Sequence, residues 1–248
     1  MNILCVGNSF SVDVTTYFHQ IAKSAGKTLN VGVLYIGGCP VKRHYDNIMN
    51  KDICDYEFYL NGRRIDDKFY NFFFGLNYMK WDYITFQQVS QESPFSETFF
   101  PELTLLMNEV RKYTDAIFIL HRTWSYKEDY ERYIDDMYNK IVNSYKEVSK
   151  ISGIPYIIPS GDGIEIGEKK YHWVMHRDGF HLNEKGRTLT GLIWAFYFLG
   201  YDIDVSSFKP EGYSYDDITP PVSNEEYQIL INIAKEVVNN NKEHNLIK

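Results

Sequence analysis

The stretch Asn2-Ile-Leu-Cys-Val-Gly7-Asn8-Ser9 decides how the fold is predicted. Its apolar residues, 3–6, end at a glycine, which is typical of a short strand buried in a parallel sheet. A helical pattern of apolar residues follows over 14–25 and stops at Gly26. Ser9 is therefore predicted at the carboxyl end of a strand, where open α/β sheets form their ligand crevice.

Short apolar runs and helical patterns alternate along the rest of the chain. Strands are predicted at 3–6, 31–36, 82–86, 116–120 and 154–158. Helices are predicted at 14–25, 99–110, 128–149 and 183–199, with a last one that begins at a capping box of Ser223 and Glu226. This alternation predicts an α/β fold, a three-layer α/β/α sandwich with a five-stranded, mainly parallel, flavodoxin-like sheet.

Residues from about 39 to 80 depart from this alternation. Within them, Asn61-Gly62 between apolar segments is the signal of a tight β-hairpin. We interpret 39–80 as an insertion that decorates one edge of the domain. The sequence contains no internal repeats, low-complexity tracts or linkers, so residues 1–248 are predicted to form a single domain.

Composition argues against several classes of partner. The net charge is −7, and the Lys and Arg residues form no long basic stripe, which argues against nucleic acid. No apolar run reaches the roughly 18–20 residues that a bilayer requires, so no membrane partner is expected. The first strand begins at Asn2 without a preceding signal peptide, and the three cysteines are irregularly spaced. Both features favour the cytoplasm. The sequence does not indicate whether the protein is a monomer or an oligomer.

A second motif, Arg177-Asp-Gly-Phe-His-Leu182, stands far downstream of Ser9. The spacing of Asp178 and His181, on a loop before a helix, lets the carboxylate reach Nδ1 of the imidazole. Nε2 is then left to accept a proton from a serine. Each motif alone also fits an ordinary turn or a surface pair. Their predicted position at one edge of the sheet favours a nucleophile with its base and orienting acid.

Two further segments offer hydrogen-bond donors for an oxyanion. Gly37-Gly38 ends the second strand and can expose a backbone N–H, although glycine pairs also occur in ordinary turns. The polar loop after the third strand offers the side-chain amides of Gln87, Gln88 and Gln91. Because side chains alternate along a strand, Gln87 and Gln88 cannot both face the crevice. We assign Gln87 to packing and favour Gln91 over Gln88 as the donor.

Together, these motifs resemble those of the SGNH, or GDSL-type, hydrolases, and more closely the branch known as DUF4886. The family's first block, usually Gly-Asp-Ser, appears as Gly7-Asn8-Ser9, and its second-block glycine matches Gly38 or, less closely, Gly37. The fifth block, Asp-x-x-His, matches Asp178 and His181. The resemblance covers essentially the whole chain, because further similar stretches lie at 81–88, 121–126 and 158–161.

The resemblance implies a serine esterase with the SGNH fold and without a cofactor. In it, Ser9, His181 and Asp178 form the triad, and the N–H groups of Ser9 and Gly38 hold the oxyanion. The third block departs from the family, because no asparagine donor stands there. The local order resembles the Gln-Gly-Glu-Ser-Asn of sialate O-acetylesterase-like members, which places Gln91 at the asparagine position with Gln88 as its rival.

The resemblance favours hydrolysis of a small acyl group, such as acetyl, from a carbohydrate or another small-molecule ester. A non-catalytic glycan- or metabolite-binding module on the same scaffold is an alternative, and the missing asparagine supports it. An O-acyltransferase is a third possibility, because a triad alone does not select water as the acceptor.

Four aromatic residues are weaker candidates for substrate binding. His44 follows the glycine loop and His121 ends the fourth strand, so we predict that either lines the crevice. Trp124 and Tyr126 are candidates for a sugar-stacking platform. Burial in the core is the alternative for all four.

Three histidines raise the question of a metal site. His172 and His176 have the i, i+4 spacing of a metal-binding helix, with His181 nearby in the chain. Trp173 follows His172 where a metalloprotease has glutamate, so no metal is predicted.

Overall fold

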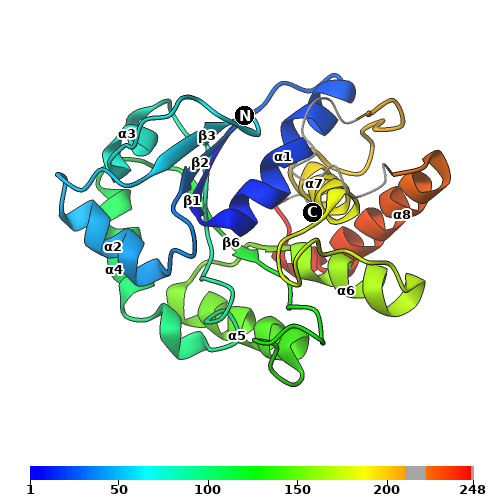
Figure 1. Ribbon diagram of the computed structural model, residues 1–248. Coiled ribbons are helices and arrows are strands. Elements are labelled where there is room, and N and C mark those ends of the chain that lie inside the picture. The colour runs from blue at the N-terminus through cyan, green and yellow to red at the C-terminus, as the bar shows by residue number, and fades with distance from the viewer. Residues whose placement is uncertain (210–221, 247–248) are drawn as a thin grey trace.

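The computed structural model describes residues 1–209 and 222–246. Within these residues, the central sheet has seven strands in the order β4-β3-β2-β1-β5-β6-β7 (Figure 1). The five predicted strands are present and mutually parallel: β1 (Asn2–Gly7), β2 (Asn30–Tyr35), β5 (Tyr83–Phe86), β6 (Ile117–Arg122) and β7 (Ile157–Pro159). The prediction of an α/β fold with a mainly parallel sheet is confirmed.

The predicted strand count was too low, because the hairpin of the irregular stretch extends the sheet. Strands β3 (Glu57–Leu60) and β4 (Arg63–Arg64) pair antiparallel, and β3 pairs antiparallel with β2. Asn61 and Gly62 form the turn with φ of 53° and 82°, the left-handed conformation that Asn-Gly hairpins adopt. The side chain of Asn61 also accepts a hydrogen bond from the N–H of Val31 at 2.9 Å, which fixes the hairpin to β2.

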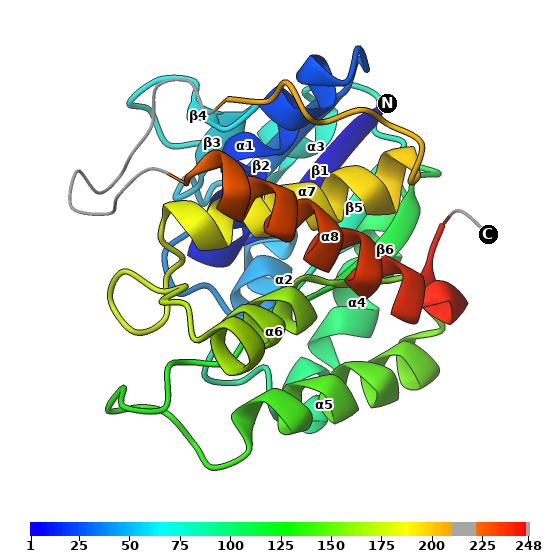
Figure 2. The same ribbon diagram turned by 90° about the vertical axis from the view of Figure 1, so that its right-hand side faces the viewer.

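Helices cover both faces of the sheet. One layer contains α1 (Ser9–Ser24), α6 (Ser160–Tyr171), α7 (Glu184–Leu199) and α8 (Asn224–Asn240), as Figures 1 and 2 show. The other contains α2 (Val41–Met49), α3 (Phe72–Asn77), α4 (Glu102–Arg111) and α5 (Met137–Ser152). Helix α7 is buried almost all round because it packs against both α1 and α8. The predicted caps of the last two helices, Asn183 and the Ser223–Glu226 capping box, are both present.

Helix α1 begins five residues earlier than the apolar pattern predicts. Asn8 is its N-cap and accepts a hydrogen bond from the N–H of Phe10 at 3.1 Å. The first turns are buried through polar side chains, so they lack the apolar periodicity of a typical buried face. Ser9 therefore stands in the first turn of the helix, rather than on a loop before it.

Two other helices also differ from the prediction. Helix α5 begins at Met137 rather than near residue 128, after Asp136 in the left-handed region with φ of 55°. Helix α6 was missed because its glycines are poor helix formers. They are required by close packing: a Cβ at Gly161 would lie 2.2 Å from the carbonyl oxygen of Thr123, and one at Gly163 would lie 2.5 Å from Ile193.

None of the helices in the described ranges combines the length and apolar character that crossing a bilayer demands.

Candidate active site

Ser9, His181 and Asp178 form a continuous hydrogen-bonded chain. Asn8 alone separates Ser9 from the end of β1, and Ser9 is the first residue of α1. Its Oγ lies 2.8 Å from Nε2 of His181, and Nδ1 of the same ring lies 2.7 Å from Oδ2 of Asp178. A carboxylate can only accept at this contact, so Nδ1 carries the proton and Nε2 is left to accept from the serine hydroxyl. This is the arrangement that a serine nucleophile with its general base requires.

The loop that carries His181 is fixed on several sides. Oδ1 of Asp178 accepts hydrogen bonds from the backbone N–H groups of His181 at 2.8 Å and Phe180 at 3.2 Å. The carbonyl of Phe180 accepts a hydrogen bond from Nε1 of Trp124 at 2.7 Å. Gly179 has a φ of 92°, which a side chain would strain, so glycine suits this turn. The imidazole is thus oriented by its backbone as well as by the carboxylate.

Asp178 is charged at neutral pH. Its partial burial acts to raise the pKa of the carboxyl, but the hydrogen bonds from the His181 ring and backbone outweigh that effect. The pKa of Asp178 is therefore below its usual value, and the carboxylate can stabilise an imidazolium when His181 takes up a proton.

Asn8 connects the start of α1, next to Ser9, to two neighbouring loops. Its Oδ1 accepts from the N–H of Phe10 at 3.1 Å and from Nε2 of Gln87 at 2.7 Å. Its Nδ2 donates to the carbonyl of Cys39 at 3.2 Å, immediately after the glycine pair. The donated bond requires an amide at this position, because a carboxylate has no N–H. The departure from the family's usual aspartate therefore has a structural reason.

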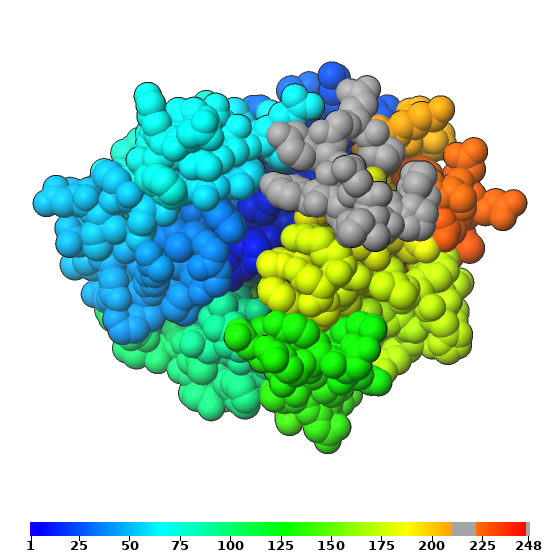
Figure 3. Space-filling view, viewed as in Figure 1, coloured from blue at the N-terminus to red at the C-terminus, as the bar shows by residue number. Residues whose placement is uncertain are grey.

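A cleft of about 340 Å³ opens at Ser9 and His181. In Figure 3, the darkest blue atoms, from the start of the chain, lie recessed between the blue and yellow segments. Aromatic rings, one guanidinium and loop backbone line the remainder of the cleft: Asn8, Tyr35, Gly37, Gly38, Val89, Ser90, Gln91, Tyr126, Tyr130, Arg132 and Phe180. The predicted glycine pair and the loop after the third predicted strand therefore meet at Ser9 and His181.

Gly38 and Gln91 are placed to offer donors to this cleft. Gly38 has a φ of 60°, and an added Cβ would meet no atom within 4 Å, so its backbone lies open. Gln91 is exposed and lines the same cleft. The N–H of Ser9 belongs to the first turn of α1, where backbone N–H groups have no partner within the helix.

Gln88 lies elsewhere. Its side chain is fully buried, and its Oε1 accepts from the N–H groups of Val41 and Val89, each at 2.9 Å. Its Nε2 donates to the carbonyl of Thr98 at 2.8 Å. The prediction of Gln88 as a rival donor is therefore corrected: its amide joins three backbone segments beneath the cleft.

Gln87 begins a buried chain of hydrogen-bonded side chains that leads away from Ser9. Its Oε1 lies 2.7 Å from Oγ of Ser11 and 2.8 Å from Nδ1 of His121. Nε2 of His121 lies 3.0 Å from Oγ of Ser160, which accepts a hydrogen bond from Trp194 at the same distance. Burial lowers the pKa of His121 to about 3, so the ring is neutral.

Three of the four predicted substrate-binding residues are buried outside the cleft. His121 belongs to the chain just described, and His44 is 1% exposed with Nδ1 2.9 Å from the hydroxyl of Tyr56. Trp124 is fully buried and stacks on Phe10, with ring centroids 4.1 Å apart. His44 faces the interior from helix α2, and His121 does so from β6, whose last five residues are all buried.

Tyr126 is the member of this group that lines the cleft, with its hydroxyl 2.7 Å from Oγ of Ser90. Sequence reasoning missed Tyr35, Tyr130 and Arg132. Phe180 was missed as well, although it stands inside the Asp-x-x-His motif, which signals its position.

The three histidines considered as metal ligands have different local environments. His176 pairs through Nδ1 with Glu168 at 2.8 Å, and His172 ends α6 in the left-handed region. Across residues 1–209 and 222–246, His, Cys, Asp and Glu form no group of three or more suited to a metal ion.

The chain is similar to several proteins of known structure. A DUF4886 family protein from Bacteroides uniformis is 29% identical, with 95% of each chain covered and a TM-score of 0.76. At 13% identity, a member of the lipolytic G-D-S-L family from Veillonella parvula matches 82% of this chain and 100% of its own, with a TM-score of 0.52. At 11% identity, a catalytic mutant of an acetylxylan esterase from Geobacillus stearothermophilus matches 82% and 95%, with a TM-score of 0.54.

No curated protein matches the sequence significantly. Residues 2–219 match the family model described as a domain of unknown function, DUF4886. The chain therefore belongs to the DUF4886 family and has the fold of the SGNH, or GDSL-type, hydrolases.

Proposed function

We propose that the protein is a serine ester hydrolase that removes a small acyl group, such as acetyl, from a carbohydrate alcohol. The observation that carries the proposal is the unbroken contact from Asp178 through His181 to Ser9, at 2.7 and 2.8 Å. The shared cleft with Gly38 and Gln91 supports it, because acyl transfer also needs donors for the oxyanion.

The reaction proceeds in two halves. Oγ of Ser9 attacks the ester carbonyl while its proton passes to Nε2 of His181. The N–H groups of Ser9 and Gly38, with the amide of Gln91, hold the oxyanion of the tetrahedral intermediate. The imidazolium then protonates the leaving alcohol. In the second half, His181 takes a proton from water, the hydroxide attacks the acyl-serine, and the acid departs as Ser9 recovers its proton.

The cleft supports a small substrate with a ring. Its volume of about 340 Å³ lies near the lower end of small-molecule sites. The rings of Tyr35, Tyr126, Tyr130 and Phe180 give apolar faces against which a sugar can pack. An acetylated sugar combines these requirements, and the acetylxylan esterase that shares the fold acts on a substrate of this kind.

Turnover of a short aryl acetate, together with labelling by a fluorophosphonate probe, tests the proposal. Wild-type protein should hydrolyse the ester and label once per chain. The variant Ser9→Ala should lose both reactions, because the attacking oxygen is gone. Ser24→Ala, at the opposite end of the same helix, should behave as wild type. Labelling or turnover that persists in Ser9→Ala would exclude Ser9 as the nucleophile.

A binding module is the second candidate, and the exposed Gln91 at the place of the family's asparagine favours it. A longer and less constrained amide holds an oxyanion less well, which suits recognition without turnover. Wild-type protein that binds acetylated sugars but neither labels nor hydrolyses would establish this alternative. A rise in product formation on adding an acceptor sugar would instead indicate an O-acyltransferase.

A further inference from the structure

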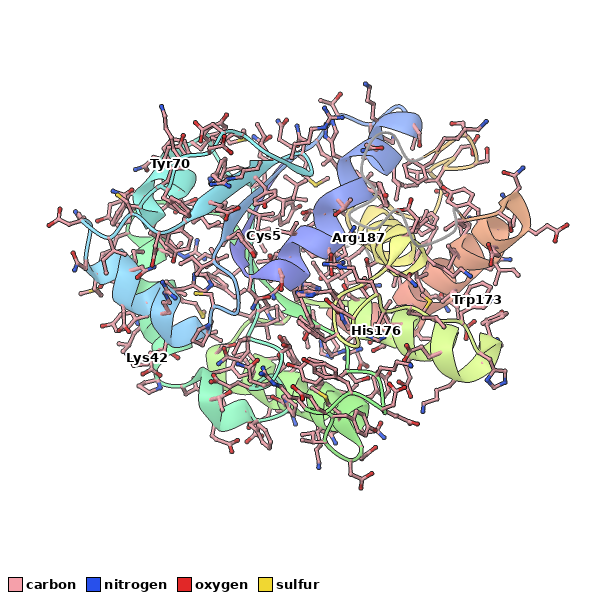
Figure 4. All side chains as sticks on the ribbon, viewed as in Figure 1. Cys5, Lys42, Tyr70, Trp173, His176 and Arg187 are labelled. Carbon is pink, nitrogen blue, oxygen red and sulfur yellow. The ribbon has the colours of Figure 1, made fainter. Side chains whose placement is uncertain are left out.

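A buried ion cluster joins the helix of the nucleophile to the loop of the base. Asp13 lies one turn after Ser9 on α1, and its side chain is 2% exposed. Oδ1 accepts from Nε and Nη2 of Arg187 at 2.9 and 2.7 Å, and from Nη1 of Arg177 at 3.2 Å. Figure 4 labels Arg187 in the interior beside α1, where its side chain is also 2% exposed.

The second oxygen of this carboxylate holds the backbone next to the base. Oδ2 of Asp13 accepts the N–H of Leu182 at 2.8 Å, and Leu182 directly follows His181. Arg177 donates to the carbonyl of Leu182 at 2.5 Å, while its own N–H donates to the carbonyl of His181 at 2.9 Å. The cluster therefore holds the peptide group that directly follows the imidazole-bearing residue, together with the carbonyl of Leu182.

The position of the Asp13 carboxylate links the position of Ser9 to that of His181. Ser9 and Asp13 are four residues apart on one rigid helix, so they lie on the same face. Fixing Leu182 to Asp13 therefore fixes His181 relative to Ser9. The contact of 2.8 Å between Oγ of Ser9 and Nε2 of His181 depends on this attachment, because the two residues are 172 positions apart in the sequence.

We propose that Asp13 is a positioning residue that sets the distance between nucleophile and base, with Arg177 and Arg187 holding its carboxylate in place. The inference rests on the proposed hydrolase function. Asp13 touches neither Ser9 nor the His181 ring through its hydrogen bonds, so it acts on the reaction through the backbone of Leu182.

The variant Asp13→Asn tests this role. It retains the size of the side chain but removes the charge that both guanidinium groups contact. A shift of about 1 Å between reacting groups lowers rates by about 10²-fold, so kcat should fall by about that factor while KM stays within about twofold. The NMR signal of the His181 Nδ1 proton should shift or broaden in the same variant, because its ring is released from a fixed orientation.

Asp162→Asn is the matched control. Asp162 on α6 pairs with Arg122, and these side chains are 16% and 3% exposed, so the variant also breaks a buried ion pair. It should lower thermal stability without changing kcat per folded molecule. The folded fraction is measured by circular dichroism for every variant, and rates are divided by it.

Arg177 gives a milder perturbation, since its side chain is 20% exposed. Arg177→Gln should lower kcat by about tenfold, and Arg177→Lys should recover most of the loss because it restores the charge. This pair decides the question if Asp13→Asn does not fold. Two results would overturn the positioning role. One is a kcat per folded molecule that falls equally in Asp13→Asn and Asp162→Asn. The other is an unchanged kcat in Asp13→Asn, or in Arg177→Gln if Asp13→Asn does not fold. Wild-type protein without esterase activity or labelling would instead overturn the proposed function.

Discussion

Replacing Asn8 by aspartate would restore the usual first block of the family, yet the structure predicts that it destabilises this protein. Asn8 is 2% exposed, and its Nδ2 donates to the carbonyl of Cys39 at 3.2 Å. The variant Asn8→Asp loses this donor and places a carboxylate oxygen against a carbonyl oxygen. It keeps an acceptor for the N–H of Phe10 and for the amide of Gln87.

The magnitude follows from these contacts. Leaving the buried carbonyl of Cys39 without its donor costs about 1–3 kcal/mol. A negative charge at the N-terminus of α1 returns about 0.3–1 kcal/mol. The net loss is about 1–2 kcal/mol at pH 7, which lowers the melting temperature by about 2–8 °C for a chain of this length.

Thermal and urea unfolding at pH 7 and pH 5 measure the effect. Burial raises the pKa of a carboxyl group, and the protonated form can donate to the carbonyl of Cys39, so the deficit relative to wild type should shrink at pH 5. Asn8→Ala is the comparison variant, because it removes all three contacts and should be destabilised at both pH values alike. An Asn8→Asp variant as stable as wild type at pH 7 would refute the reasoning.

Three further predictions concern the two glutamines near the cleft and the pH dependence of the reaction. Gln91→Ala should lower kcat by roughly 10²–10³-fold with little change in KM, because an oxyanion donor serves the transition state. Gln88→Ala should instead lower the free energy of unfolding by about 3 kcal/mol, since it leaves three buried backbone groups unpaired, and urea unfolding checks this. The pH profile of kcat/KM should contain no ionisation of Asp178 between pH 5 and 8, because the lowered pKa of this carboxyl keeps it charged throughout that range, and two ionisations in the measured profile would contradict this assignment.

The parts of the fold that the sequence predicted depend on local patterns. The five parallel strands are short apolar runs with clear ends, and the Asn61-Gly62 turn has few alternatives. The early turns of α1 and the glycine-rich α6 were missed because tertiary packing, rather than propensity, determines them. In α6, small residues are needed where the helix approaches Thr123 and Ile193.

The contacts between Asp178, His181 and Ser9 could be anticipated because the motifs fix both residue and spacing. The prediction of which side chains line the cleft failed where it depended on the direction in which a side chain points. Strands buried on both faces show no apolar–polar alternation, so nothing in the sequence told whether His121 or Gln88 faces the cleft or the interior. Both are buried and fully engaged with neighbouring polar groups.

The separation of Ser9 and His181 along the sequence also determines when their contact can first form during synthesis. Ser9 leaves the ribosome 172 residues before His181, so the strand, the cap and the first helix can form while the base is still absent. The loop of His181 leads directly into α7, which packs between α1 and α8. A nascent chain that has not yet docked α7 therefore carries a serine without its proton acceptor. Under the proposed mechanism, reactivity at Ser9 therefore requires that α7 has docked, and partly folded chains are expected to be inert.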